Sequence, residues 1–367
     1  MVIILAYGIT LSLLYILVFT DLFLAWKNYN KHETRSGQRF LSLVVPVYNN
    51  INGLEKLIDS IGNQDYPDEL FELIIVDDHS SPPVTIPEYQ YKGLTVKLLR
   101  NKFEKGKKYA LKTGIEAASG ETIITTDVDC LPGRTWLSSV SSMIPDIEPF
   151  FISLPVFMNY KGGAFHKFQS LEFSSLVATG AASFAKGSPV MCNGANLAFS
   201  KDLFMEAFPL MKPGIPSGDD MFLMLYTKKR YRSNMFFGKD PDAVVETDPE
   251  RIARDFLIQR TRWSSKSLFY RDGYLVFLST LILLLSISII TLAVFGIIDK
   301  SQYLPGFLVL FISKSIMDFF FLNTFLGFFN RRKMLNFFLP SLFLWPFYIV
   351  FAAFSGFVSF FKGLSIK

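Results

Sequence analysis

The sequence predicts an α/β domain with a mostly parallel sheet and helices on both faces, flanked by transmembrane α-helices. Three observations lead to this fold class. Long apolar stretches lie near both ends of the chain, strand and helix patterns alternate between them, and acidic residues directly follow two of the strands. We expect one membrane-spanning helix before the domain and about three after it.

The apolar stretches indicate a membrane protein. Of the 367 residues 50% are hydrophobic, 39 are Phe, and the mean hydropathy is positive, which is unusual for a soluble domain. About 20 apolar residues cross the hydrocarbon core of a bilayer. Residues 2–24, 274–298, 304–329 and 334–361 meet this requirement. Because the first stretch lacks a basic start and a cleavage site, we interpret residues 1–25 as an uncleaved anchor. Pro340 and Pro346 predict a kink or a re-entrant turn in the last stretch.

Basic residues at the borders of these stretches predict the orientation of the chain. With four spans, three basic clusters fall on one side, which we expect to be cytoplasmic. Residues 299–303 would then form a short loop on the other side. The net charge of +5 suits anionic lipid headgroups at these borders and gives no indication of nucleic-acid binding. We therefore expect an integral protein of the inner or plasma membrane. The basic residues are Lys27, Lys31, Arg35, Arg39, Arg260, Arg262, Lys266, Arg271, Arg331, Arg332 and Lys333.

Residues 38–271 form the expected domain, followed by membrane helices within residues 274–361. Strands are predicted at residues 40–47, 71–76, 94–99 and 122–126, and helices at residues 53–61 and 107–118. Asn52 is the expected cap of the first helix, and the proline-rich residues 80–87 are an expected loop. Ligands of such sheets bind beyond the carboxyl ends of the strands. The acidic residues there should therefore converge in one crevice.

Asp127 and Asp129 follow the strand at residues 122–126 and are separated by one residue. Two carboxylates suit Mg²⁺ or Mn²⁺, which bind one or two carboxylates together with substrate phosphates. The alternative is a solvated turn or a helix cap, because this short pattern is common.

Asp77 and Asp78 follow the strand at residues 71–76 in the same way. A carboxylate at this position accepts hydrogen bonds from a base or a ribose. The alternative is that one of the two only caps a turn through its own backbone.

Two further clusters lie later in the chain. Asp219 and Asp220 follow Gly218 and precede a helical run, where the helix dipole already favours a carboxylate. The functional interpretation is a general base, with Asp220 as the candidate. Residues 259–263, with Arg262 and Trp263, offer donors for a diphosphate and a flat face for a sugar. Taken alone, this cluster is better explained by an interfacial amphipathic helix.

The four clusters, in this order, resemble the family 2 glycosyltransferases with the GT-A fold. Within that family they are most similar to the membrane-bound branch of cellulose-, chitin- and hyaluronan-synthase-like and ceramide-glucosyltransferase-like enzymes. The resemblance covers about residues 40–270 and the flanking spans. It is carried by Val45-Pro46-Val47-Tyr48-Asn49, Val76-Asp77-Asp78-His79-Ser80, Gly106-Lys107, Ala110-Leu111, Gly120-Glu121, Asp127-Val128-Asp129, Asn193-Gly194-Ala195-Asn196, Asp219-Asp220 and the Gln-x-x-Arg-Trp motif that begins at Gln259.

The resemblance implies a role for each cluster. Asp127 and Asp129 would bind Mg²⁺ or Mn²⁺, and Asp220 would be the catalytic base. Asp219, Gln259, Arg262 and Trp263 would serve the diphosphate and the acceptor. Asp219 stands where Glu is frequent, so this acidic pair is one methylene shorter. Ser81 stands where an acidic residue often stands, so the nucleotide preference is left open. The residues that would bind the nucleotide-sugar are Pro46, Tyr48, Asp77, Asp78, Lys107 and Asp127.

We therefore expect an inverting, metal-dependent transfer of sugar, with UDP-sugar as the expected donor, to a lipid or lipid-linked acceptor. A processive polysaccharide synthase needs a channel, for which four spans are few, unless the chain forms a homo-oligomer. A transporter, or a sensor with an inactive transferase-like domain, is the alternative from another class. Lys314 and Asp318, four residues apart in the third span, are the charged pair that a transporter or an acceptor path would use.

Overall fold

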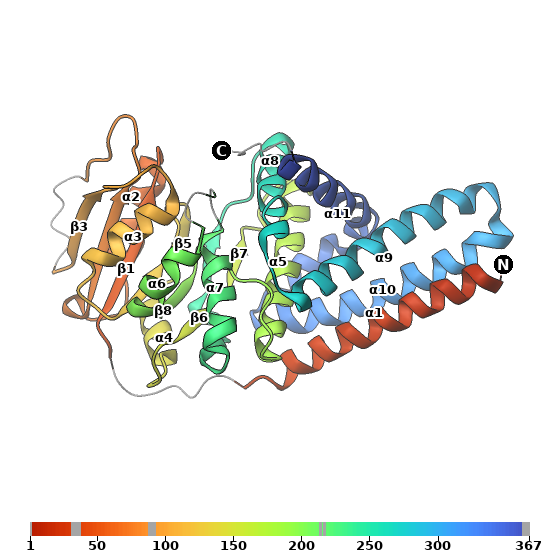
Figure 1. The fold of residues 1–367 in the computed structure, drawn as a ribbon, viewed down its shortest axis with the longest axis horizontal. Coiled ribbons are helices and arrows are strands. Elements are labelled where there is room, and N and C mark those ends of the chain that lie inside the picture. Colours follow the sequence, from red (N-terminus) through yellow and green to blue (C-terminus); the bar gives the residue numbers. More distant parts are fainter. Residues whose placement is uncertain (1, 31–37, 87–92, 213–214, 216–217, 362–367) are drawn as a thin grey trace. The chain divides into compact units, whose positions relative to one another are not determined.

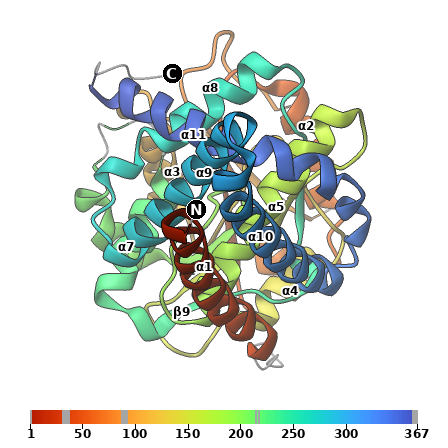
Figure 2. The same ribbon diagram turned by 90° about the vertical axis from the view of Figure 1, so that its right-hand side faces the viewer.

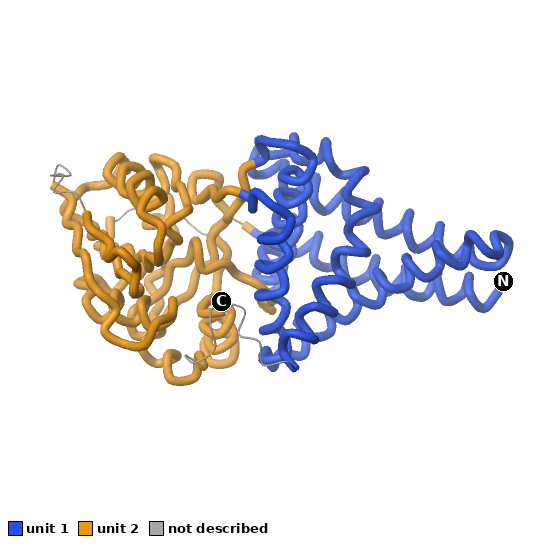
Figure 3. The backbone as a smooth tube through the Cα atoms, turned by 90° about the horizontal axis from the view of Figure 1, so that it is seen from above, with its two compact units in different colours: residues 1–29, 160–186, 249–367 blue, residues 30–159, 187–248 orange. Residues whose placement is uncertain are grey.

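The computed structural model describes residues 2–30, 38–86, 93–212, 215 and 218–361. By compactness the chain divides into two units (Figure 3). The helical unit comprises Met1–Tyr29, Tyr160–Lys186 and Pro249–Lys367, and the sheet unit comprises Asn30–Asn159 and Gly187–Asp248. This division crosses the expected domain of residues 38–271, whose limits stay a prediction. The expected features at Lys31, Arg35 and Pro87 lie outside the described residues.

The sheet unit is built around a seven-stranded sheet in the order β3-β2-β1-β4-β8-β6-β9 (Figure 1). The first four strands run parallel, β8 is antiparallel to β4 and to β6, and β9 is parallel to β6. The predicted α/β class with a mostly parallel sheet is confirmed. The strands are β1 (Leu41–Val47), β2 (Phe71–Asp77), β3 (Thr95–Arg100), β4 (Thr122–Thr125), β6 (Phe151–Ser153), β8 (Leu197–Ser200) and β9 (Met235–Phe237).

A second, three-stranded sheet has the order β5-β10-β7, and the described residues of the sheet unit also form five α-helices. The central strands β1 and β2 are apolar and buried along almost their whole length, as expected for strands covered on both faces. The remaining elements are β5 (Cys130–Pro132), β7 (Val156–Met158), β10 (Val245–Thr247), α2 (Ile51–Gly62), α3 (Lys107–Ala117), α4 (Trp136–Met143), α6 (Lys201–Ala207) and α7 (Asp219–Arg230).

Helix α2 shows where the sequence-based bounds needed correction. Its apolar residues at helical spacing are buried as predicted. However, the cap is Asn50, whose Oδ1 accepts a hydrogen bond from the Gly53 amide at 3.0 Å, and Asn52 lies within the first turn. Both asparagines are good caps by residue type, so the pattern alone did not distinguish them.

The helical unit contains α1 (Val2–Asn28), α5 (Ala164–Ala185), α8 (Ala253–Ser264), α9 (Gly273–Ile298), α10 (Lys300–Phe328) and α11 (Phe338–Phe361). Four segments of the described chain are helical, long and apolar enough to cross a membrane, namely α1, α9, α10 and Arg332–Phe361. One is amino-terminal and three are carboxy-terminal, as predicted. The expected loop at residues 299–303 is wrong, because the Asp299 side chain accepts from the Gln302 amide and α10 begins at Lys300.

Helices α1 and α10 pack along each other, with α9 beside α10 (Figure 2). Trp26 of α1 contacts the rings of Phe325, Phe328 and Phe329. Elsewhere along these two helices, Lys314 and Asp318 of α10 form the expected ion pair, and the Tyr15 hydroxyl of α1 donates to Asp318. These charges therefore satisfy one another between the two helices.

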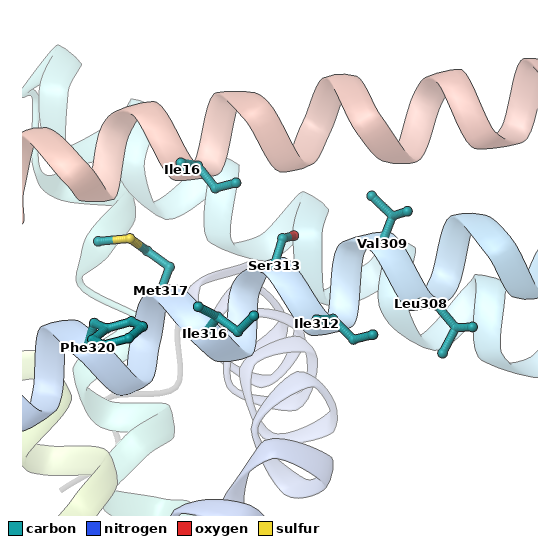
Figure 4. A pocket seen from close by; sticks show the side chains of 8 residues that line it. All are labelled: Ile16, Leu308, Val309, Ile312, Ser313, Ile316, Met317 and Phe320. Atoms are coloured by element: carbon teal, nitrogen blue, oxygen red, sulfur yellow. The ribbon is translucent and has the colours of Figure 1, made fainter.

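An apolar groove of about 510 Å³ follows the same two helices (Figure 4). Its lining has one polar side chain, Ser313, so it suits hydrocarbon and not a nucleotide. The lining residues are Ile16, Leu308, Val309, Ile312, Ser313, Ile316, Met317 and Phe320.

Candidate active site

In the sheet unit, β1 and β4 stop pairing before the carboxyl end of β1. Strand β1 pairs with β2 as far as Val47 and Asp77, but its pairing with β4 ends at Val44 and Thr125. Pro46 has no amide hydrogen. It lies in the stretch that no longer pairs with β4, so no hydrogen bond between β1 and β4 is lost there. Because β1 is also the strand at which the chain order reverses, this is where parallel sheets bind ligands.

Asp77 and Asp78 have different local roles. The Asp77 carboxylate accepts from the amides of Ser80 (2.9 Å) and Val84 (3.2 Å), so it holds the turn after β2. Burial would raise the pKa of Asp77, but these hydrogen bonds outweigh it and lower the pKa.

Asp78 instead connects the turn to the segment that starts α3. Its carboxylate accepts from the Asn101 side-chain amide at 2.7 Å and from the backbone amide of Gly106 at 3.0 Å. The turn-capping alternative in the sequence therefore describes Asp77, and Asp78 orders the approach to Lys107.

Lys107 lies between two other predicted residues, Asp127 and Asp219. At the first position of α3, its Nζ lies 2.5 Å from Oδ1 of Asp127 and 3.8 Å from Oδ2 of Asp219. Burial would lower the pKa of Lys107, but the neighbouring carboxylates, Asp127 first, outweigh it and raise the pKa. The ammonium therefore keeps its charge between the end of β4 and the start of α7.

Asp220 lies beside this group, in the first turn of α7. The turn begins after Gly218, whose φ of 76° lies in the left-handed region that glycine tolerates. Oδ2 of Asp220 accepts from the Gly194 amide at 3.0 Å, and Oδ1 accepts from the Met221 amide at 2.7 Å. Burial, followed by the charge of Asp219, raises the pKa of Asp220 to about 6. A carboxyl with this pKa takes up and releases a proton near neutral pH.

Gly194 passes close to the whole cluster. A Cβ at this position would lie 3.1 Å from Oδ2 of Asp219, 3.4 Å from Cβ of Asp220 and 3.4 Å from Nζ of Lys107. The Gly194 carbonyl also accepts from the Thr125 hydroxyl at 3.0 Å, which fixes this segment to the end of β4. The backbone at Gly194 is thus one wall of the site.

Asp127 and Asp129 fit a divalent cation that is shared with a phosphate-bearing ligand. Partial burial and the charge of Asp127 raise the pKa of Asp129, so a cation between them would relieve a repulsion that the structure contains. Within the described residues, no three His, Cys, Asp or Glu side chains gather so that they could hold a metal by themselves. Two carboxylates with substrate phosphates are a common set for Mg²⁺.

Tyr48 offers an aromatic face at the end of β1. Its side chain is 49% exposed, and Lys105 Nζ lies 3.6 Å from the ring centroid. The Asn49 amide donates to the Ser80 hydroxyl at 3.0 Å, so the segments after β1 and β2 are tied together. An exposed ring at this position is suited to stacking on a base.

Gln259, Arg262 and Trp263 lie on α8, in the helical unit. The Gln259 side chain donates to Glu250 at 2.8 Å, and Trp263 packs against Phe173 of α5 with ring centroids 6.2 Å apart. The four residues Lys107, Asp127, Asp219 and Asp220 thus gather in the sheet unit, and the motif on α8 forms its own cluster.

Several residues of the site were not predicted as such. Asn101 and Lys108 carried no recognisable pattern, yet Asn101 binds Asp78, and the buried Lys108 ammonium donates to the carbonyls of Lys212 and Ile215 ahead of α7. Burial lowers the pKa of Lys108 to about 8. The one feature of the sequence that could have indicated Lys108 is its place directly after Lys107 at the start of a helix. A solvated lysine explains this pattern equally well.

Part of the chain matches a known protein family. Residues 42–208 match the model of the family described as Glycosyl transferase family 2. The matched part includes Asp77, Asp78, Lys107, Asp127 and Asp129, and it ends before α7 and α8. Over this range, which is just under half of the chain, the sequence is similar to glycosyltransferase family 2 domains.

Two curated relatives and one solved structure are similar to parts or all of the chain. Glycosyltransferase AglE of Haloferax volcanii is 30% identical over 107 residues, which are 29% of this chain and 35% of that protein. The Escherichia coli protein named UDP-Glc:alpha-D-GlcNAc-diphosphoundecaprenol beta-1,3-glucosyltransferase WfgD is 32% identical over 89 residues, 24% of this chain and 34% of that protein. The chain thus matches about a third of each relative's length. These names support the prediction of a glycosyltransferase.

The solved structure is the mannosyltransferase PcManGT from Pyrobaculum calidifontis in complex with GDP-Man and Mn²⁺. It superposes with a TM-score of 0.57, covering 99% of this chain and 98% of that chain at 16% identity. At this identity the similarity shows the fold alone. It extends over the sheet and the four apolar helices together.

Proposed function

We propose that this protein is an inverting, metal-dependent glycosyltransferase that moves a sugar from a nucleotide-sugar to a lipid or lipid-linked acceptor at a membrane. The observation that carries the proposal is the cluster of Lys107, Asp127, Asp219 and Asp220 beyond the carboxyl ends of the strands. It combines the positive charge of Lys107, which suits a diphosphate, with the carboxylate of Asp220, whose pKa of about 6 suits a general base.

In the proposed reaction Asp220 takes the proton of the acceptor hydroxyl. The hydroxyl oxygen then bonds to the anomeric carbon while the bond from that carbon to the diphosphate breaks, and the electron pair leaves with the diphosphate. Attack from the side opposite the leaving group inverts the anomeric configuration. Lys107 lies where its ammonium offsets the charge that develops on the departing oxygen.

The donor is held by residues from three strand ends. Tyr48 stacks on the base, Pro46 and Asp77 shape the loops around it, and Asp78 and Asp127 receive the sugar hydroxyls of the nucleotide. Mg²⁺ or Mn²⁺, bound by Asp127 and Asp129, supplies Lewis-acid stabilisation of the diphosphate. The names of the similar proteins mention UDP-Glc in one case and GDP-Man with Mn²⁺ in another. The donor screen therefore includes both uridine and guanosine nucleotide-sugars.

The acceptor is proposed to be a lipid or lipid-linked sugar on the cytoplasmic side. Four apolar helices would hold the domain at the bilayer, and the name of one relative specifies a diphosphoundecaprenol acceptor. Gln259, Arg262 and Trp263, with Asp219, are proposed to bind the diphosphate and the acceptor. The length of the product separates a single transfer from a processive synthase, because one added sugar shifts the acceptor by one step on chromatography.

The test is a donor screen with purified protein in detergent. UDP-glucose, UDP-N-acetylglucosamine and GDP-mannose are each incubated with Mn²⁺ and with undecaprenyl phosphate or GlcNAc-diphosphoundecaprenol. We expect one donor to release its nucleoside diphosphate and to give a glycosylated lipid. If no donor exceeds the Asp220→Asn variant in either measurement, the proposed function is wrong.

The rate of transfer is expected to rise with pH through about 6. The raised pKa of Asp220 means that the proton leaves the carboxyl only above this pH, and the base works without its proton. Below pH 6, kcat/KM should fall by about tenfold per pH unit. Measurement of kcat/KM from pH 5 to 8 checks this, and a flat profile would remove Asp220 from the role of base.

Gly194→Ala is expected to reduce transfer by about ten- to a hundredfold with little loss of fold. The added Cβ presses on Asp219, Asp220 and Lys107 together. Gly133→Ala is the matched control, since a Cβ at Gly133 meets nothing within 4 Å. Turnover and thermal unfolding of both variants are compared. Equal turnover in the two would mean that the wall at Gly194 does not constrain the site.

A further inference from the structure

Glu172 and Arg260 form a buried ion pair between α5 and α8 of the helical unit. Nη2 of Arg260 lies 2.5 Å from Oε2 of Glu172, and the two side chains are 2% and 3% exposed. The hydroxyl of Tyr348 on α11 donates to the other carboxylate oxygen, Oε1, at 3.0 Å. Three helices that are distant in sequence therefore meet at one carboxylate.

Arg260 also organises its own helix. The centre of its guanidinium lies 4.2 Å from the centroid of the Trp263 ring and 4.7 Å from that of Phe256. Its Nη1 donates to Oε1 of Gln259, and the Gln259 amide in turn donates to Glu250. Arg260 thus contacts both Gln259 and Trp263, which stand on either side of it in the Gln-x-x-Arg-Trp motif.

Stability alone does not account for this pair. Removing two charges from water is costly, and apolar side chains of similar size often stabilise a protein at least as well. Burial would lower the pKa of Arg260, but Glu172 outweighs it and raises the pKa, so the charge is retained. Arg260 stacks on Trp263 of its own helix, and a planar guanidinium donates in fixed directions. With that stack kept, few rotations of α8 about its axis let Arg260 reach Glu172 of α5.

We infer that Arg260, anchored by Glu172 and Tyr348, is a positioning residue that fixes Gln259 and Trp263 for transfer to the acceptor. This inference rests on the proposed function, and on the part of it in which those two residues bind the acceptor. Lysine at this position keeps the charge but loses both the second direction of donation and the planar stack. Arg260→Lys therefore separates positioning from charge.

The experiment measures steady-state transfer by Arg260→Lys and Glu172→Gln, with the donor and lipid acceptor found in the screen. Turnover is normalised to the number of nucleoside diphosphate sites in each sample, so misfolded protein does not count. We expect kcat to fall about tenfold or more in both variants. The KM for the nucleotide-sugar should stay within about twofold of the unaltered protein. Arg254→Lys, the same change at an exposed position of α8, is the control and should alter neither value.

A purely structural pair would reduce the number of binding sites but leave normalised turnover unchanged, and this result would overturn the inference. A rise in the KM for the nucleotide-sugar with unchanged kcat would overturn it as well. If the unaltered protein transfers no sugar at all, the proposed function fails, and the fluorescence emission of Trp263 tests whether Arg260 positions this ring. The contribution of Trp263 is obtained by subtracting the emission spectrum of the Trp263→Phe form of each protein from the spectrum of that protein. It should change with Arg260→Lys and Glu172→Gln but not with Arg254→Lys, and no change would overturn the positioning role.

Discussion

Asp220→Asn is expected to lower kcat by about 10²- to 10⁴-fold, the range that a positioned general base contributes. The side-chain amide has nearly the shape of the carboxylate, and its oxygen still accepts from the Gly194 amide. It loses the ability to take the acceptor proton, and its NH₂ group replaces the oxygen that accepts from the Met221 amide. Binding of the nucleoside diphosphate should be unchanged, because Lys107 and Asp127 remain. Single-turnover transfer and equilibrium nucleotide binding measure the two effects separately.

The stability of the same variant, relative to that of the unaltered protein, should depend on pH. The pKa of Asp220 is raised to about 6 in the folded protein, above its usual value, so ionisation costs folding free energy as pH rises from about 4 through 6. The neutral asparagine avoids this cost but gives up the hydrogen bond from the Met221 amide. The unfolding temperature of the variant, measured relative to that of the unaltered protein at the same pH, should therefore rise between pH 5 and pH 7.5.

The matched control is Asp202→Asn, which changes an exposed aspartate at the second position of α6, as Asp220 is at the second position of α7. Both substitutions remove a favourable charge from the first turn of a helix. A large drop in kcat for Asp202→Asn, or full activity for Asp220→Asn, would exclude the proposed role of Asp220.

The features of the site that the sequence predicted are those set by local patterns. An apolar, β-rich run followed by acidic residues places Asp77 and Asp127 at strand ends, and parallel pairing through β1 brings those ends to one edge. The division of roles between Asp77 and Asp78 could not be predicted, because it depends on which amides approach: Ser80 and Val84 for one, Gly106 for the other.

Contacts between distant segments carried no sequence signal at all. Glu172 lies within α5, where most side chains are buried and no polar stripe sets a position apart, and its partner Arg260 lies 88 residues away. Arg260 itself is indistinguishable by pattern from the basic residues expected at a membrane border. The closeness of Gly194 to Lys107 and Asp219 likewise follows from how β8 and α7 are placed in the folded unit.

Asp127→Asn is expected to lower kcat/KM by about a thousandfold and to raise the Mn²⁺ concentration needed for half-maximal rate. A metal at a leaving diphosphate is worth several kcal/mol of charge stabilisation, and loss of one of two carboxylates weakens its binding. The substitution also breaks the ion pair between Lys107 and Asp127, in which Nζ lies 2.5 Å from Oδ1. Asp219, with Oδ2 at 3.8 Å from the same Nζ, then remains as a charged neighbour of Lys107. Rates at donor concentrations below KM give kcat/KM, and titration of the transfer rate with Mn²⁺ gives the midpoint.

Two further variants separate the metal from the ion pair. Lys107→Met breaks the same ion pair but leaves both carboxylates, so its rate should fall while the Mn²⁺ midpoint does not rise. Asp59→Asn, at an exposed position of α2, should alter neither quantity. If Asp127→Asn and Lys107→Met show the same midpoint, Asp127 acts through Lys107 and not as a metal ligand. A rise confined to Asp127→Asn makes the carboxylate pair after β4 the metal-binding edge of the site, with Lys107 as a second, permanent positive charge beside it.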